Sequence, residues 1–202
     1  MTSITHSLLR TRLGLAALFV ALVSAGLAAQ SNAPMVRYTA TATNLDPTVR
    51  LTATLVDIAV SRWSTDAERQ RLLGILKENG QDKLLKALQD LPRVGTIKTP
   101  DSLAFALHYA RRIPTDDGGE RIVLVTDRDI SFWEAANQSR TLEYPFMVIE
   151  LRLDSRGRGE GKMTVATKLD VDKDGQIVLE NYGSQPVRLG SVKRDDKTYD
   201  SR

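Results

Sequence analysis

The sequence contains no cysteine, which excludes disulfide bonds, a thiolate nucleophile and cysteine-ligated zinc. Histidine is almost as scarce, because His6 lies in the N-terminal segment and His108 is the only other one. A nucleophile activated by histidine would therefore depend on His108, and no Gly-x-Ser-x-Gly turn accompanies it. We expect a structural role for His108. We also expect stability to come from a hydrophobic core.

Aromatic residues make up only 5% of the chain, and the formal net charge is +3. Two of the 28 basic residues, Arg10 and Arg12, lie in the N-terminal segment, so 26 remain against 25 acidic ones beyond it. A nearly neutral chain with few aromatics gives no electrostatic basis for binding nucleic acid. We therefore expect no nucleic-acid partner.

Long apolar runs are absent apart from residues 13–23, which follow Arg10 and Arg12 and precede a series of small residues. This order predicts a secretory signal peptide over residues 1–29. No later segment approaches the roughly 20 apolar residues of a membrane span. We expect an exported protein, periplasmic or extracellular, with no membrane span after signal removal.

The remaining chain is long enough for one hydrophobic core and has no visible internal repeat. We predict a single sheet-rich domain over residues 35–193 and a disordered tail over residues 194–202. Residues 37–43 and 49–60 alternate as strands and are joined by an Asn-Leu-Asp-Pro turn, so they should pair. The second of these strands has apolar residues on both faces, which predicts that both faces are covered.

Two short helices are predicted next. Thr65 and Glu68 have the spacing of a capping box at a helix start, and Gly80 provides a helix end. Residues 82–91 then carry leucines at helical spacing. We expect the pair to form a helical hairpin against the sheet, with its leucine stripe in the core.

Residues 101–112 are ambiguous between strand and helix. Thr99-Pro100-Asp101 resembles a helix start, whereas residues 104–110 alternate small and large side chains as a strand does. The turn signal at 116–119 and the β-branched run at 121–126 favour a hairpin, and thus a strand.

The C-terminal half predicts further strands, at 144–153, in a hairpin over 163–182, and at 187–192, the last at a sheet edge because of Pro186. A loop over 155–161 should connect the first two. The hairpin pattern sets Val171 opposite Ile177, Leu169 opposite Leu179 and Lys168 opposite Glu180.

The same hairpin resembles a calcium loop at Asp170, Asp172, Asp174 and Gly175. Such a loop needs a bidentate Glu at its twelfth position, which is Asn181 here. We therefore expect no metal and no cofactor.

The element order predicts an α+β fold, with a mostly antiparallel curved sheet or partly closed β-barrel and an inserted two-helix hairpin. Whether the sheet is open or closed is not decided by the pattern. A cupped sheet of this kind has room for a small ligand.

Carboxylates supply the candidate catalytic residues. Asp127, Glu150 and Glu180 could form an acid and base pair, although neighbouring cations such as Arg128, Arg152 and Lys168 favour ion pairs on a solvated face. The candidate ligand-binding residues are the aromatic cluster and two arginines: Trp133, Tyr144, Phe146, Tyr182, Arg128 and Arg152.

Several short motifs occur together: Thr126-Asp127-Arg128, Phe132-Trp133-Glu134, Tyr144-Pro145-Phe146, Glu150-Leu151-Arg152-Leu153, Gly159-Glu160-Gly161 and Glu180-Asn181-Tyr182. In these the chain resembles a family of uncharacterised small exported bacterial proteins. The resemblance implies export and carries no activity or ligand.

The leading functional hypothesis is an exported binding or accessory domain for a small, partly apolar ligand. A barrel-type hydrolase or isomerase using a carboxylate pair is one alternative, although the sequence favours a protein that is not an enzyme. A non-catalytic structural or interaction protein of the cell envelope is the other.

Overall fold

The computed structural model describes residues 36–43, 53–128, 140–173, 177–182 and 186–195, all within the compact unit of residues 32–202. Its strands are β1 (Val36–Thr43), β2 (Ala53–Val60), β3 (Gly95–Lys98), β4 (Phe105–Leu107), β5 (Tyr109–Pro114), β6 (Glu120–Asp127), β7 (Phe146–Leu153), β8 (Arg158–Val171), β9 (Ile177–Asn181) and β10 (Val187–Asp195). Its helices are α1 (Asp66–Gln89) and the short 3-10 helix η1 (Arg140–Glu143).

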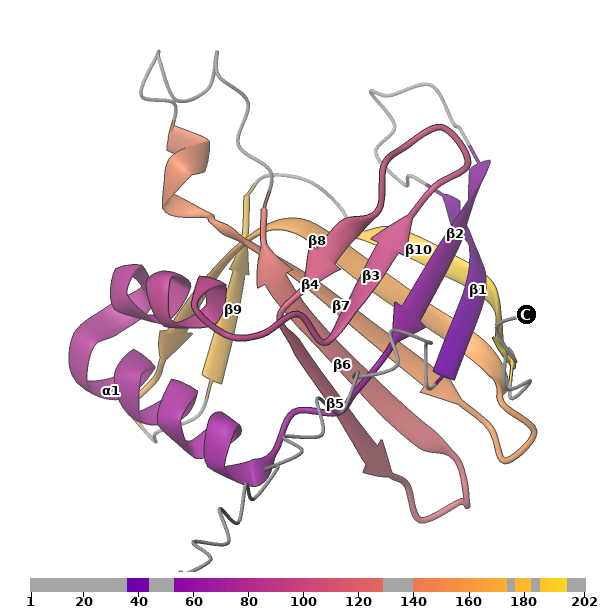
Figure 1. The fold of residues 1–202 in the computed structure, drawn as a ribbon, viewed down its shortest axis with the longest axis horizontal. Helices are drawn as coiled ribbons and strands as arrows, with labels where there is room; N and C mark the ends of the chain where they lie inside the picture. The colour runs from indigo at the N-terminus through magenta and orange to yellow at the C-terminus, as the bar shows by residue number, and fades with distance from the viewer. Residues whose placement is uncertain (1–35, 44–52, 129–139, 174–176, 183–185, 196–202) are drawn as a thin grey trace, which may run out of the picture. The chain divides into compact units, whose positions relative to one another are not determined.

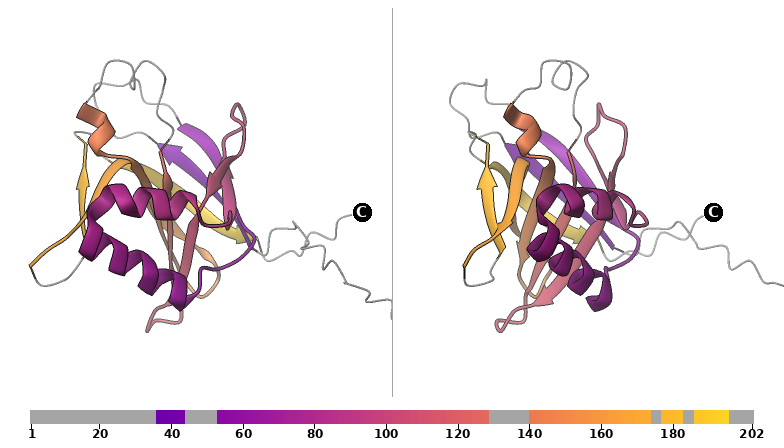
Figure 2. Two further views of the ribbon diagram at one scale, coloured as in Figure 1. Left: turned by 60° about the vertical axis from the view of Figure 1, so that its left-hand side comes forward. Right: turned by 90° about the vertical axis from the view of Figure 1, so that its left-hand side faces the viewer.

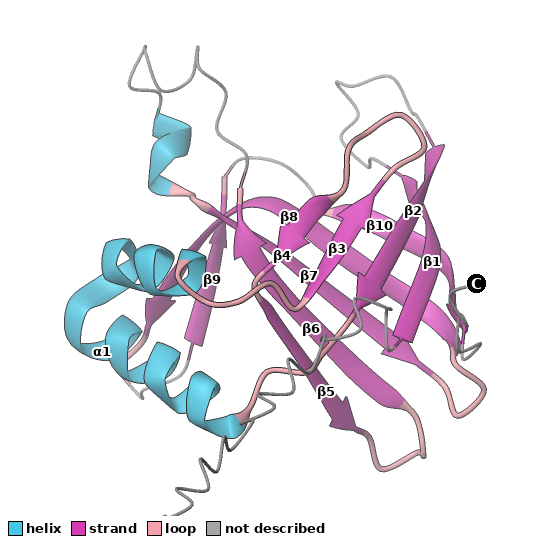
Figure 3. Ribbon diagram, viewed as in Figure 1, coloured by secondary structure: helices cyan, strands magenta, loops and turns pink. Residues whose placement is uncertain are grey.

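The strands form one antiparallel sheet in the order β4-β3-β2-β1-β10-β8-β7-β6-β5, with β9 paired to β8 (Figures 1 and 3). The predicted α+β class with a mostly antiparallel, barrel-like sheet is confirmed. The sheet curls into a nearly closed barrel, and α1 packs on its outer side against β6 and β8.

The two ends of the sheet meet in residues 105–114. β4 pairs with β3, and β5, which begins one residue after His108, pairs with β6. The Thr126 hydroxyl on β6 donates a 2.8 Å hydrogen bond to the Ala106 carbonyl on β4, which bridges the seam. The Nδ1 atom of His108 lies 3.0 Å from the Leu91 carbonyl oxygen, so this histidine has a structural partner at the bend.

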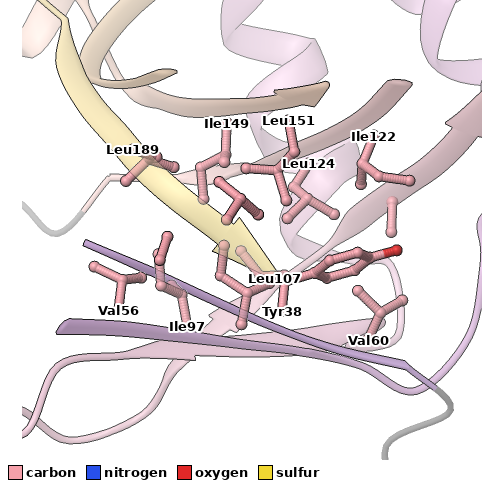
Figure 4. Close-up of a cluster of buried hydrophobic side chains, with 14 of the residues drawn as sticks. Tyr38, Val56, Val60, Ile97, Leu107, Ile122, Leu124, Ile149, Leu151 and Leu189 are labelled. Atoms are coloured by element: carbon pink, nitrogen blue, oxygen red, sulfur yellow. The ribbon is translucent and has the colours of Figure 1, made fainter. Parts of the chain in front are cut away.

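The barrel interior is filled by alternate residues of nearly every strand (Figure 4). The predicted alternation of β1 is seen in the structure, where Tyr38, Ala40 and Ala42 lie inside the barrel. The interior core comprises Tyr38, Ala40, Ala42, Val56, Ile58, Val60, Val94, Ile97, Leu107, Ala110, Ile122, Leu124, Ile149, Leu151, Leu153, Leu189 and Val192.

β2 pairs with β1 as predicted, but the expectation that both of its faces are covered is wrong. Its inner residues are buried, whereas Leu55 on the outer face is 62% exposed. The helix packs against strands on the other side of the seam, so nothing in the described residues covers this part of the outer surface.

Helix α1 begins where the sequence predicts. Thr65 Oγ1 accepts a hydrogen bond from the Glu68 amide, and the Glu68 carboxylate accepts one from the Thr65 amide, which completes the capping box. The predicted two-helix hairpin is not seen, because residues 66–89 form one helical element. Gly80 kinks it sharply with φ 75° and ψ −176° (Figure 2), a conformation that glycine adopts without steric cost.

Residues 105–107 and 109–114 are strand, so the preference for strand over helix is confirmed, with β5 and β6 forming the expected hairpin. β3 is not foreseen from the sequence. Its four residues carry too short a pattern, and its pairing with β2 is non-local.

The predicted loop over 155–161 is wrong for its second half. β8 is a 14-residue strand that begins at Arg158, so Gly159 and Gly161 lie inside it, opposite Leu153 and Leu151 of β7. A Cβ on Gly159 would overlap the carbonyl oxygen of Arg152. These glycines allow β7 and β8 to approach closely, and are not loop residues.

The hairpin of β8 and β9 has the predicted register, with Val171 opposite Ile177, Leu169 opposite Leu179 and Lys168 opposite Glu180. Its turn at 174–176, including Asp174 and Gly175, lies outside the described residues. The predicted edge position of the last strand is wrong, because β10 lies between β1 and β8 and continues to Asp195. Within the described residues, no helix is long and apolar enough to cross a membrane.

Replacing Gly159 by Ala should destabilise the fold by more than about 1 kcal/mol, because the new methyl group would push β7 and β8 apart. Gly74 is the control. It lies within α1, and a methyl group added there would meet no atom within 4 Å, so Gly74→Ala should stabilise by about 0.5–1 kcal/mol. Urea unfolding measures both, and equal effects of the two variants would contradict the close approach.

Thr65→Ala should lower the free energy of unfolding by about 1 kcal/mol, because it leaves the Glu68 amide without its acceptor. The midpoint of denaturant unfolding should fall at constant slope. Glu78→Ala, at an exposed position of the same helix, should change stability by no more than about 0.5 kcal/mol. An unchanged midpoint for Thr65→Ala would show that the cap does not stabilise the helix.

Candidate functional site

A cavity of about 480 Å³ lies between α1 and the outer face of the strands from β5 to β9. We call it the helix groove. It is distinct from the barrel interior, because its walls come from the second cluster of buried side chains. Its lining is Arg69, Leu72, Leu73, Leu76, Leu84, Leu88, Tyr109, Arg111, Ile113, Arg121, Val123, Val125, Phe146, Val148, Glu150, Leu169, Ile177 and Leu179.

The floor of the groove follows from strands with apolar residues on both faces. In β6, Ile122 and Leu124 point into the barrel, so Val123 and Val125 point outward toward α1. In β7, Ile149 points inward while Phe146 and Val148 point outward. The predicted leucine stripe of α1 supplies the opposite wall, with Leu72, Leu76, Leu84 and Leu88.

The side chains of the floor change from mostly apolar to charged along the strands. One cross-strand row, Tyr109-Val125-Val148, is mostly apolar. The next outward-facing row, Arg111-Val123-Glu150, carries opposite charges at its two ends and lies about 7 Å further along the strands. The groove therefore has an apolar end toward Phe146 and a charged end toward Arg121.

Glu150 is the most heavily paired charge at the charged end. Its carboxylate lies 3.1 Å from Arg121, 2.9 Å from Arg152 and 3.7 Å from Lys162. Burial of Glu150 acts to raise its pKa, but the hydrogen bonds and charges of Arg152, Arg121 and Lys162 prevail and lower that pKa below its ordinary value. Glu150 is thus stabilised as an anion, and its lowered pKa is the opposite of what a proton donor needs at neutral pH.

A second polar cluster lies where α1 begins. Arg111 Nη1 on β5 lies 2.8 Å from Asp66 Oδ1 on the helix. Burial raises the pKa of Tyr109 above its ordinary value, against the effect of the nearby Arg111 and Arg69. The Tyr109 hydroxyl therefore stays protonated and available as a hydrogen-bond donor at neutral pH.

The predicted ligand-binding residues do not gather in one place. Phe146 lies in the floor of the groove and is fully buried. Tyr144 and Tyr182 meet edge to face with ring centroids 5.1 Å apart, and the Tyr144 hydroxyl donates to Glu180 at 2.6 Å. Trp133 lies outside the described residues.

The two predicted arginines lie at different places. Arg128 donates hydrogen bonds to the carbonyl oxygens of Tyr144 and Thr141, so it holds the segment that leads into β7. Arg152 lies beside Glu150 at a smaller cavity of about 290 Å³, lined by Glu150, Arg152, Glu160, Gly161 and Lys162.

The candidate carboxylates have separate partners. Asp127 accepts a hydrogen bond from Gln89, Glu180 accepts one from Tyr144, and Glu150 pairs with its three cations. Asp127 is opposite Phe146, four residues along β7 from Glu150, which separates their backbones by about 13 Å. No interaction joins any two of the three in the described part of the chain.

Sequence reasoning missed Arg69, Tyr109, Arg111 and Arg121 as groove residues. The period of two in β5 and β6 places Tyr109, Arg111 and Arg121 on the outward face of the sheet, so the sequence pattern could have grouped these three residues. Arg69 carries no such signal, because its position depends on how α1 lies on the sheet. Within the described residues there is no group of three or more His, Asp or Glu placed to hold a metal ion.

Comparisons of the chain with protein-family models, with curated proteins and with solved structures found no match.

Glu150→Gln should destabilise the protein at pH 7, because the folded state lowers the pKa of this carboxyl and so favours its charged form. This contribution is present above the ordinary pKa of glutamate and is lost as the pH falls through the lower folded-state pKa. The difference in unfolding free energy between variant and wild type should therefore shrink between about pH 5 and pH 3.

Glu160→Gln is the matched control, since its salt bridge to Arg188 is exposed on both sides and should contribute about 1 kcal/mol or less at pH 7. Urea unfolding at several pH values measures both variants. A Glu150→Gln difference that does not change with pH would show that the charge of Glu150 is not the source of its contribution.

Proposed function

We propose that the chain is an exported module that binds a small, partly apolar ligand in the helix groove. The observation that carries this proposal is the groove itself, with a volume of about 480 Å³, leucines on one wall and Val125, Phe146 and Val148 on the other. Small-molecule sites have volumes of about 300–1,000 Å³ and mostly apolar walls with a few polar groups that orient the ligand.

The groove is also separate from the part of the protein that maintains the fold. The barrel interior has its own core, from Tyr38 on β1 to Leu189 on β10. The helix groove uses the opposite face of β6 and β7. A ligand can therefore occupy the groove without displacing the side chains that fill the barrel.

Export rests on the N-terminal pattern, in which Arg10 and Arg12 precede the apolar run at 13–23. A binding module of this kind would act in the periplasm or outside the cell. The absence of cysteine is compatible with an oxidising compartment, since the fold needs no disulfide.

The alternative of a carboxylate-dependent hydrolase or isomerase has less support. A glycosidase-type pair needs two carboxyl groups about 5–10 Å apart with one raised pKa. Asp127 and Glu180 have neutral partners at different places, and Glu150 has a lowered pKa.

The alternative of an interaction protein has one specific observation in its favour. Among the described strands, β9 pairs only with β8. Its residues Ile177, Val178 and Leu179 are each 43–52% exposed. An edge strand with exposed apolar residues can pair with another chain. This candidate predicts a dimer or a complex, which the experiment below detects.

Native mass spectrometry of the chain purified from its own host tests the proposal. Wild-type protein should carry an additional small mass that denaturation releases. Leu73→Trp places an indole ring in the groove and should reduce the occupancy about tenfold, which corresponds to about 1.4 kcal/mol of lost binding. Leu103→Trp, at a loop position that is 94% exposed, should leave it unchanged.

Circular dichroism should show that both variants keep the fold. Wild-type protein with no retained mass, or equal retention by Leu73→Trp and wild type, would contradict the proposal. A ligand-free dimer would instead support the interaction protein.

A further inference from the structure

The charges around the groove do not balance. Three arginines line its charged end, namely Arg69, Arg111 and Arg121, and the carboxylates beside them are Asp66 and Glu150. Arg152 and Lys162 also pair with Glu150 but lie outside the groove lining. Glu150 is shared by three of the cations, which leaves Asp66 as the partner of Arg111. Cations therefore exceed anions at this end of a mostly apolar cavity.

Arg69 has the fewest ion-pair partners of these cations. It projects from α1 into the groove lining and has no ion pair within the described ranges. The neighbouring pair of Arg111 and Asp66 is weak, because the Asp66 side chain is 84% exposed and strongly hydrated. An anion arriving at this point would meet Arg69, could replace water around Arg111, and could accept a hydrogen bond from Tyr109.

The positions of the charges give the groove one charged end and one apolar end, which would orient a bound ligand. Arg69, Tyr109 and Arg111 line one end, whereas Phe146, Leu169 and Leu179 line the other. The outward rows of the sheet place these two ends on one continuous surface beneath α1. A molecule lying obliquely across the strands, from β5 toward β7 and β9, would have one end among arginines and the other among aliphatic side chains.

We propose that the groove binds a free, single-chain aliphatic carboxylate, with its head group at Arg69, Arg111 and Tyr109 and its tail against Leu73 of α1, Val148 and Leu179. This inference rests on the proposed binding function and specifies the class of ligand. Arginine suits the head group because its planar guanidinium can donate two hydrogen bonds to one carboxylate.

The volume limits the length of the tail. Since one water molecule takes up about 30 Å³ in the liquid, a volume of about 480 Å³ corresponds to roughly 16 water-sized atoms. Decanoate, with about 12 heavy atoms, fits within this limit and leaves room for water at the head group. A two-chain membrane lipid does not fit within it.

Calorimetric titration with three compounds that share a ten-carbon tail separates this inference from the proposed function. Decanoate, 1-decanol and decyltrimethylammonium are each added at pH 7.5 to the purified exported chain, below the concentration at which they aggregate. Decanoate should bind at least tenfold more tightly than the alcohol, and the cation should bind most weakly. Added salt should weaken decanoate binding and leave alcohol binding unchanged.

Arg69→Gln should weaken decanoate binding about tenfold and change decanol binding less than twofold. Arg71→Gln removes the same charge from an exposed position of α1 outside the groove lining, and it should leave both affinities unchanged. Equal binding of decanoate and decanol, or equal loss in both variants, would overturn the carboxylate inference while the binding function stands. Failure of all three compounds to bind would overturn the carboxylate inference, while the retained mass in native mass spectrometry decides the binding function separately.

Discussion

Closure of the sheet by residues 105–114 is the constraint on which the other features of this protein depend. β4 and β5 are a single run of chain bent at His108, and they take opposite neighbours, β3 and β6. The Thr126 hydroxyl bridges the seam by donating a hydrogen bond to the Ala106 carbonyl oxygen. On the other edge of β5, the Ser64 hydroxyl accepts a hydrogen bond from the Ala110 amide, and the Ser64 amide donates one to the Ala110 carbonyl oxygen. Once the sheet curls in this way, one face of most strands fills the interior.

That closure decides where the helix groove forms. Strands β6 and β7 have apolar residues on both faces, and the interior needs only one of them. The other face would remain exposed to water without α1. Covering a curved sheet with a helix that is kinked at Gly80 leaves space between the two layers, and this space is the helix groove. The site is thus a consequence of packing a bent helix on a barrel.

The ion pairs fall into two kinds with different consequences. Glu120 is a buried carboxylate held by Arg112 of its own hairpin and Arg194 of β10, so it joins parts of the barrel that lie far apart in sequence. Its side chain is only 4% exposed, and losing either partner would leave a poorly compensated buried charge. Arg69 and Arg111, in contrast, border the groove, where their charges remain available to a ligand.

The sequence alone determined what depends on neighbours a few residues apart. The capping box of Thr65 and Glu68, the break at Gly80, the alternation of β1 and the register of β8 with β9 were all predictable, because each requires side chains within one turn or one hairpin. Only the tertiary structure decided the internal position of β10, the role of Gly159 as a contact with β7, and the meeting of Arg69 with Tyr109 and Arg111. These depend on contacts between segments distant in sequence, and a pattern of period two or 3.6 specifies which face of a segment is apolar without specifying what that face will contact.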